Sequence, residues 1–127
     1  MSLLINKAIS NILTTSTGLT AKVGSNIYAL VAPDSVTFPF VVFKRNNLIP
    51  EYTKDGLAYN NTDIQVIIGA ANYTDSVEVA QLVRNSLELK KGLYNGINII
   101  ECKLAGAEED FVENSFAQSL TFSIKSY

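Results

Sequence analysis

The carboxylates of one short acidic segment are the side chains of this sequence that come nearest to a chemical site. Glu108, Glu109, Asp110 and Glu113 lie close together in the chain. Clustered carboxylate oxygens are ligands that a hard cation such as Ca²⁺ prefers, but the EF-hand spacing and its central glycine are missing. Because a run of like charges is more typical of a solvated loop, we expect residues 105–110 to form an exposed turn without a metal ion.

The other residue types needed for catalysis are scarce. The chain has 127 residues and no histidine, which excludes Ser-His-Asp and Cys-His catalysis and histidine-metal sites. Its one cysteine, Cys102, lies in an alternating pattern and is expected to pack as a small hydrophobic side chain. None of the seven glycines belongs to a phosphate-binding loop. The sequence therefore predicts no catalytic, cofactor-binding or metal-binding residue, and a protein that is not an enzyme.

The tyrosines allow several interpretations. Aromatic side chains in loops could stack single-stranded bases, could lie in a protein–protein interface, or could pack half-buried at the edge of the core. The formal net charge is −2 and the pI is about 5.0, whereas a protein that binds the phosphate backbone needs clustered Lys and Arg. We expect no specific nucleic-acid binding. The six tyrosines are Tyr28, Tyr52, Tyr59, Tyr73, Tyr94 and Tyr127.

Two amphipathic helices are predicted. The first spans about residues 2–15, where apolar side chains recur at helical spacing, and the small hydroxyl residues before Gly18 end it. The second begins near Asp75, which forms a capping-box pattern with Glu78 and precedes an apolar stripe facing the sheet. The apolar positions of the two stripes are Ile5, Ala8, Ile9 and Ile12, then Val79, Leu82, Val83 and Leu87.

The remaining apolar segments predict strands over about residues 26–30, 40–45, 63–68, 97–104 and 116–125. Ile64, Val66 and Ile68 alternate with polar residues and should line a core face, while Ile67 suggests that the opposite face is partly covered too. The chain length corresponds to one domain, residues 1–127. We therefore predict an α+β fold: a mostly antiparallel β-sheet with two helices packed on one face.

A long hairpin arm is expected at about residues 46–61, with its turn at Lys54-Asp55-Gly56. A connection of this length in a small domain is usually functional or disordered. Hydrophobic residues make up 47% of the chain and charged residues 17%, against about 25% charged in a typical soluble domain. Apolar surface of this kind is covered by self-association or by a partner. The oligomer interface is expected to include Tyr52, Lys54, Asp55, Tyr59 and Ile67.

The order of these segments resembles a known family. Tyr28 and Ala32-Pro33 precede the strand opening Phe38-Pro39-Phe40-Val41-Val42-Phe43, and a later strand ends near Gly69. A Tyr-Thr-Asp turn then enters a helix of the form Val-x-Ala-x-x-Val-Arg-x-x-Leu. This pattern resembles the tail-completion or tail-terminator proteins of long-tailed bacteriophages and prophages.

The resemblance implies a structural protein without cofactors that forms a ring, expected to be a hexamer. The ring would cap the tail tube, stop its polymerisation and join it to the head connector, so its partners would be its own copies, the tail-tube protein and the head-connector protein. DNA would pass through the ring. The location would be the tail of the virion, after assembly in the host bacterial cytoplasm.

Two other functions stay open: a different phage neck or tail component, or a general protein-interaction module. A small enzyme that uses carboxylates or tyrosines is the least favoured class. No segment approaches the roughly 18 apolar residues of a membrane span, and the first residues lack the features of a signal peptide. No membrane partner is therefore expected.

Overall fold

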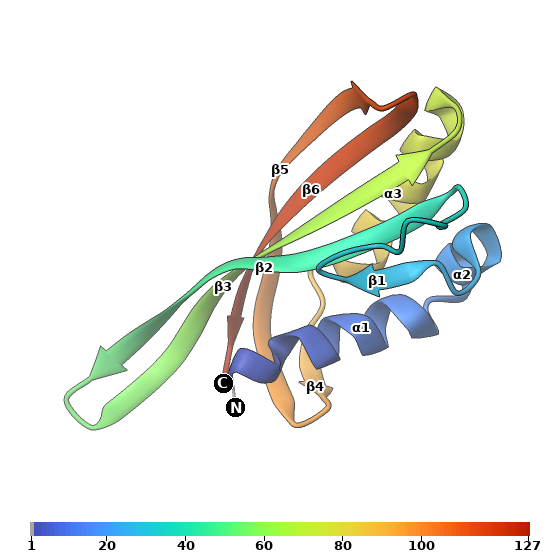
Figure 1. The fold of residues 1–127 in the computed structure, drawn as a ribbon. Helices are drawn as coiled ribbons and strands as arrows, with labels where there is room; N and C mark the ends of the chain where they lie inside the picture. The colour runs from blue at the N-terminus through green and yellow to red at the C-terminus, as the bar shows by residue number, and fades with distance from the viewer. Residues whose placement is uncertain (1) are drawn as a thin grey trace.

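One six-stranded sheet dominates the fold (Figure 1). The computed structural model describes residues 2–127. Within these residues the strands follow the order β1-β2-β3-β6-β5-β4, and all neighbours are antiparallel except the parallel pair β1–β2. The strands are β1 (Ile27–Ala29), β2 (Phe40–Thr53), β3 (Gly56–Ala70), β4 (Gly92–Tyr94), β5 (Ile97–Val112) and β6 (Ser115–Ser126).

The helices pack on one face of this sheet. A short 3₁₀ turn, Ser2–Leu4, leads into α1 (Ile5–Thr15), followed by α2 (Thr17–Val23) and, after β3, by α3 (Tyr73–Leu87). The predicted apolar stripe of α1 is buried, and so are Val79, Val83 and Leu87 of α3. The α+β class is confirmed, but the described residues contain three α-helices where the sequence predicts two.

The additional helix, α2, begins at Thr17, within the stretch that the sequence predicts to end the first helix. Ser16 adopts an extended conformation and separates α1 from α2. α2 begins with Thr17 and Gly18, which have low helix propensity, and seven residues are too few to form a stable helix alone. Leu19 and Val23 are nevertheless buried in the core, and Lys22 forms an ion pair with Glu78 of α3 at 2.8 Å. Tertiary packing therefore stabilises this helix.

The N-terminus of α3 corrects a second prediction. The capping residue is Asn72, whose Oδ1 accepts a hydrogen bond from the Asp75 backbone N–H at 2.8 Å. Asp75 lies in the first turn, where its carboxylate accepts a hydrogen bond from Asn72 Nδ2 at 3.0 Å. Its negative charge also interacts favourably with the positive end of the helix dipole. Glu78 does not take part in this cap and pairs with Lys22 instead.

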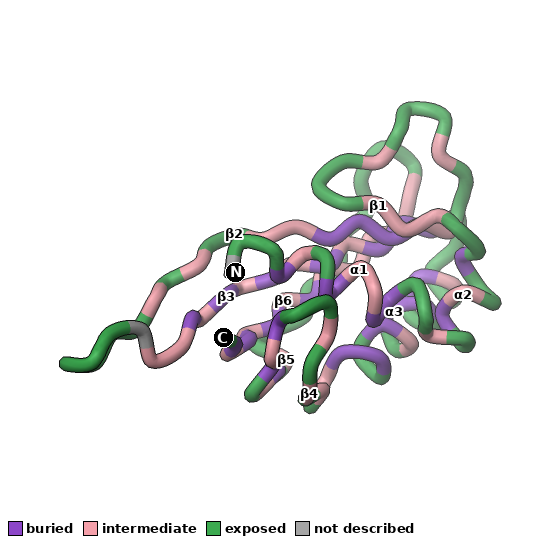
Figure 2. Tube along the Cα trace, turned by 90° about the horizontal axis from the view of Figure 1, so that it is seen from below, coloured by how far each residue is buried: buried purple, intermediate pink, exposed green. Residues whose placement is uncertain are grey.

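The core lies between the sheet and the helices. Ile64, Val66 and Ile68 are completely buried, as their alternation predicts. In the neighbouring strand β6, Phe122 pairs with Ile64 and Leu120 pairs with Val66, and both are also buried. Figure 2 shows buried segments of the central strands in the body of the molecule, whereas the far end of the β2–β3 hairpin is exposed. The helices therefore cover one face of the central strands, and the other face is open.

The acidic segment forms a strand, which contradicts the turn predicted for residues 105–110. β5 continues to Val112, and the turn comes at Glu113 and Asn114, both with positive φ. The sequence signal for a turn is the run of acidic residues. In the structure Gly106 adjoins a register shift in the β5–β6 pairing, which is a frequent position for glycine within a strand.

Candidate functional site

The β2–β3 hairpin forms an arm that extends beyond the rest of the sheet (Figure 1). The sequence predicts this arm at about residues 46–61; from here on, the arm means residues 51–59 only. In these residues β2 and β3 pair with each other, while the pairing of β3 with β6 ends at Asn60. The expected turn is present, with Thr53 paired to Gly56 and the Asp55 N–H donating to Thr53 Oγ1 at 3.3 Å. The arm is therefore a paired two-stranded ribbon. A ribbon of this kind is only marginally stable in water without a further surface to pack on.

The five residues expected in an interface lie in three places. Tyr52, Lys54 and Asp55 are together on the exposed arm, and 72% of the Tyr52 surface is accessible. Tyr59 is half-buried at the base of the arm, where the Lys125 ammonium lies 5.3 Å from its ring centre. Ile67 is farther along β3, paired with Val42 and Ser119, and is half-buried on the open face.

Ile67 lines a groove on this open face. The groove has a volume of about 290 Å³, and Glu108 and Asp110 stand at one side of it. Its lining is shared by β3, β5 and β6, without any helix. The residues are Gln65, Ile67, Glu108, Glu109, Asp110, Val112, Ala117 and Ser119.

The acidic residues do not converge on one point. Glu108 and Asp110 pair with Ser119 and Ala117, so they share a face, whereas Glu109 pairs with Gln118 and lies on the other face, because successive strand residues alternate. Within residues 2–127 the structure has no group of three or more His, Cys, Asp or Glu side chains that could hold a metal ion.

Glu109 belongs to a cluster that the sequence did not reveal, at the end of the β5–β6 hairpin. Its carboxylate accepts hydrogen bonds from the Tyr73 hydroxyl at 2.9 Å and from Gln118 Nε2 at 3.1 Å. The bond to Glu109 and the negative charge of that carboxylate raise the pKa of Tyr73. Phe116 lies between Tyr73 and Phe111, with ring centres 6.2 and 4.9 Å away. The cluster joins the N-terminus of α3 to the sheet and leaves Phe111 56% exposed.

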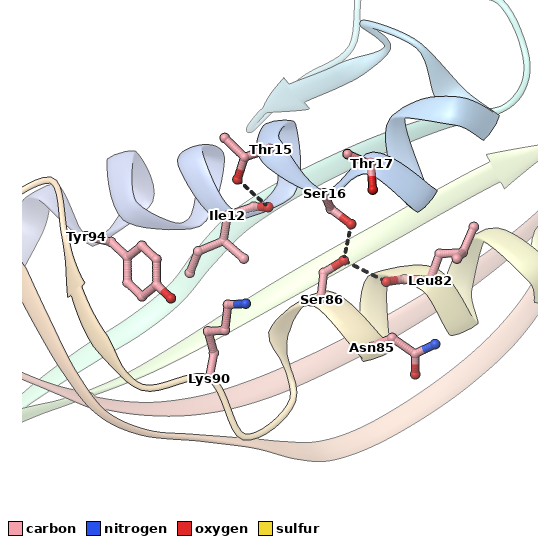
Figure 3. Close-up of a pocket in the computed structure, with 9 residues that line it drawn as sticks. All are labelled: Ile12, Thr15, Ser16, Thr17, Leu82, Asn85, Ser86, Lys90 and Tyr94. Carbon is pink, nitrogen blue, oxygen red and sulfur yellow. Dashed lines mark hydrogen bonds between the residues drawn. The ribbon is translucent and has the colours of Figure 1, made fainter.

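A second cavity, of about 350 Å³, lies where α1, α2 and α3 meet (Figure 3). The Ser86 hydroxyl donates to Ser16 Oγ at 2.7 Å across this junction. Lys90 is the one charged side chain in the lining, and the remaining polar groups are hydroxyls and one amide. The Ser86 hydroxyl is bonded to Ser16 and to the Leu82 carbonyl, and within the described residues neither serine forms a hydrogen bond to Lys90, so the arrangement holds the three helices together.

Cys102 is buried, as expected, with 1% of its surface accessible. Burial, with a smaller contribution from the charge of Glu88, raises its pKa to about 12. The thiolate is the reactive form of cysteine, so this thiol packs in the core and is poorly suited to nucleophilic chemistry.

A family model described as "Tail completion protein gp17" matches residues 7–124. The chain belongs to this family. Membership makes it a structural protein of a phage tail, a member of the tail completion proteins that its sequence pattern resembles.

The fold of this tail completion protein also occurs in a solved structure. A chain of the "Virion of native gene transfer agent (GTA) particle" superposes with a TM-score of 0.83 at 18% sequence identity, covering 94% of this chain and 91% of that chain. At this identity the likeness concerns the fold. No curated protein matches the chain.

No helix of residues 2–127 is long and apolar enough to cross a membrane. Of the surfaces described here, the sequence revealed the arm through its turn signal. It did not reveal the Tyr73–Glu109 cluster, because these two partners are 36 residues apart and the sequence pattern predicts an exposed turn at Glu109.

Proposed function

We propose that this tail completion protein is a tail terminator. In this proposal six copies form a ring at the head-proximal end of the tail tube. The ring ends tube polymerisation, receives the head connector and lets DNA pass. The family match over residues 7–124 is the observation that carries the proposal. The protein would reside in the virion tail and would assemble in the host bacterial cytoplasm.

The arm supports the ring because it needs a surface to pack against. Tyr52, Lys54 and Asp55 extend beyond β6 without cover from another strand or helix of the described chain. We propose that they contact a neighbouring subunit, with Tyr59 fixing the base of the arm and Ile67 contributing the open-face groove. Such a contact is heterologous, and heterologous contacts close into rings when the rotation between subunits permits.

Tail assembly in cells that lack the native gene provides the test. Complementation with the native chain should give tails of uniform length joined to heads, whereas its absence should give tubes of variable length without heads. In parallel, native mass spectrometry of the purified protein, alone and with tail-tube protein, should detect a species of six 13.8-kDa chains.

An arm variant separates assembly from folding. Residues 51–59 are replaced by Asn-Gly, a two-residue hairpin turn between the paired residues Pro50 and Asn60. This variant should keep the circular dichroism spectrum and cooperative unfolding of the native chain but lose the ring. Lys91→Ala, an exposed change far from the arm, is the control and should assemble.

Two results would contradict the terminator function: a chain that stays monomeric when tube protein is present, or tails of normal length in cells that lack this chain. Binding to tube protein without any effect on tail length would favour another tail component.

A further inference from the structure

β2 has one free edge along the half of the strand that leads into the arm. β1 pairs only with Val41, Val42 and Phe43 of β2. The Leu30 N–H donates to the Phe43 carbonyl at the end of this contact. From residue 44 to residue 53, β2 has β3 on one side and no strand of the described chain on the other.

β5 has a corresponding free edge on the opposite margin of the sheet. β4 pairs with Ile97–Ile99, and the last backbone bond on this side runs from the Leu89 N–H to the Cys102 carbonyl at 2.7 Å. From residue 103 to residue 112, β5 pairs with β6 on one side, and no strand of the described chain lies on the other. The two free edges are equal in length.

These edges lie at diagonally opposite corners. Phe40 at the start of β2 is level with Gly69, Ala117 and Asp110 across the sheet. The free part of β2 therefore lies towards the arm, and the free part of β5 lies towards the opposite end, at the turn before β6. Unpaired backbone groups on a strand edge are a template for another strand, and proteins usually shorten or cover such edges.

We propose that, in the ring proposed above, the free edge of β5 in one subunit pairs with the free edge of β2 in the next subunit, in antiparallel orientation. The partner is a second copy of this chain, so this inference rests on the proposed function. Backbone hydrogen bonds between the two edges, except at Pro50, which has no N–H to donate, would continue one sheet from subunit to subunit.

Strand direction supports the antiparallel orientation. β2, β3, β6 and β5 are successively antiparallel, so β5 runs opposite to β2 in the same subunit. A neighbouring copy that has the same orientation, as a ring requires, therefore presents its β2 antiparallel to this β5. The diagonal positions of the edges displace each copy along the strands, which is the stagger found when the strands of a closed sheet are inclined to its axis.

The charges along the two edges are complementary in this orientation only. An antiparallel arrangement brings Lys44 and Arg45, at the start of the β2 edge, beside Glu109 and Asp110, near the end of the β5 edge. A parallel arrangement would instead place Lys44 beside Lys103. Opposite charges across strands stabilise a sheet and like charges destabilise it.

The faces also agree. Lys44 is adjacent in the alternation to Phe43, which points into the core, so Lys44 lies on the open face; Asp110 lies on this face as well, because it pairs with Ala117. With Lys44 beside Asp110, Phe111 and Val112, which are 56% and 48% exposed in the single chain, would reach the neighbouring Phe43 and Val42, where β1 ends the free edge. The pairing therefore combines backbone bonding with charge complementarity.

Cysteine cross-linking of the full chain tests the pairing. Asn47 and Glu108 are exposed and lie on the open face of the two edges. The double variant Asn47→Cys/Glu108→Cys, oxidised under conditions in which native mass spectrometry detects the ring, should give a ladder of disulfide-linked species up to the full ring on a denaturing gel. Each single variant should assemble but remain a monomer on the same gel, because head-to-tail contact never brings two identical positions together. The native Cys102 is buried, and the unmodified chain controls for it.

Three outcomes would overturn the inference. Rings that form without a ladder would show that other surfaces join the subunits, and the terminator function would survive. Dimers from either single variant would show that like edges meet in a two-fold contact. Absence of any ring, with and without tail-tube protein, would remove both the pairing and the ring on which it rests.

Discussion

The ring of Phe40 lies directly across the sheet from Gly69. The two residues are opposite each other in the β2–β3 pairing, and a Cβ added to Gly69 would stand 2.5 Å from both Cε1 and Cζ of Phe40. Glycine here thus provides the space that the aromatic ring occupies, at the end of the sheet where β3 leads to α3.

Gly69→Ala should destabilise the protein because the ring of Phe40 must move out of a packed position. Overpacking of this type costs about 1–3 kcal/mol, and the lower end is expected because the ring can turn about its own side-chain bonds. Chemical unfolding monitored by circular dichroism measures the change. In a double-mutant cycle, Phe40→Leu should remove most of the penalty; a penalty that persists with leucine would show that the strain lies in the backbone.

The cap of α3 gives a second prediction. Asn72→Ala removes the side-chain oxygen that accepts the Asp75 N–H and should lower the free energy of unfolding by about 0.5–2 kcal/mol. Asn72→Ser is the matched control, because serine is also a good capping residue, and it should retain most of the stability. Equal stability of the alanine and serine variants would mean that the cap contributes little.

Residue patterns predict the central part of this fold well. The period-two alternation of Ile64, Val66 and Ile68, and that of Phe122 and Ile124, identifies strands whose core faces are the buried ones in the structure. Such patterns are reliable because a shift of one residue would move every apolar side chain to the wrong face. The arm turn at Lys54 and Asp55 was predictable for a similar local reason.

The elements that sequence analysis missed depend on distant contacts. Nothing local in Thr17-Gly18-Leu19-Thr20 favours a helix, and α2 exists because Leu19 and Val23 fit the core. The acidic run in the outer half of β5 predicts a solvated turn, whereas the turn of the β5–β6 hairpin lies at Glu113 and Asn114 and has no glycine. The free edges cannot be predicted from local patterns, since they follow from strand order.

The buried thiol of Cys102 should be chemically silent in the folded protein. Its pKa of about 12 leaves almost no thiolate at about pH 8, where an unperturbed cysteine of pKa about 8.5 is substantially ionised. An aromatic disulfide reagent should therefore modify no thiol in the native chain and one thiol after unfolding in denaturant. Rapid modification without denaturant would indicate that β5 opens locally near Cys102.

The Tyr73–Glu109 hydrogen bond should make the β5–β6 end of the sheet sensitive to alkaline pH. The pKa of Tyr73 is raised in the folded state, so its stabilising contribution is present below the unfolded pKa of about 10 and is lost as the pH rises through the folded pKa. Ultraviolet titration of tyrosinate should show one tyrosine ionising later than a free phenol, and Tyr73→Phe should remove that late transition. Persistence of the transition in Tyr73→Phe would assign it to another tyrosine.

A charge exchange between Lys44 and Asp110 tests whether β2 and β5 recognise each other between subunits. Both side chains lie on the open face, and no ion pair of the described chain contains either. Lys44→Glu and Asp110→Lys should therefore each fold with near-native stability, since isolated surface charges contribute little.

Each single variant should weaken ring formation, because it places like charges side by side at every subunit contact, and the loss should be greatest at low salt, where screening is weakest. The double variant Lys44→Glu/Asp110→Lys restores opposite charges and should recover the ring, measured by native mass spectrometry across a salt series. Exchange of Lys91→Glu, an exposed lysine that belongs to neither free edge, controls for the change in net charge. Recovery of the ring in the double variant is the decisive result, because two charge changes at unrelated positions would not compensate for each other. A double variant that forms the ring no better than the single variants would place Lys44 and Asp110 at separate surfaces.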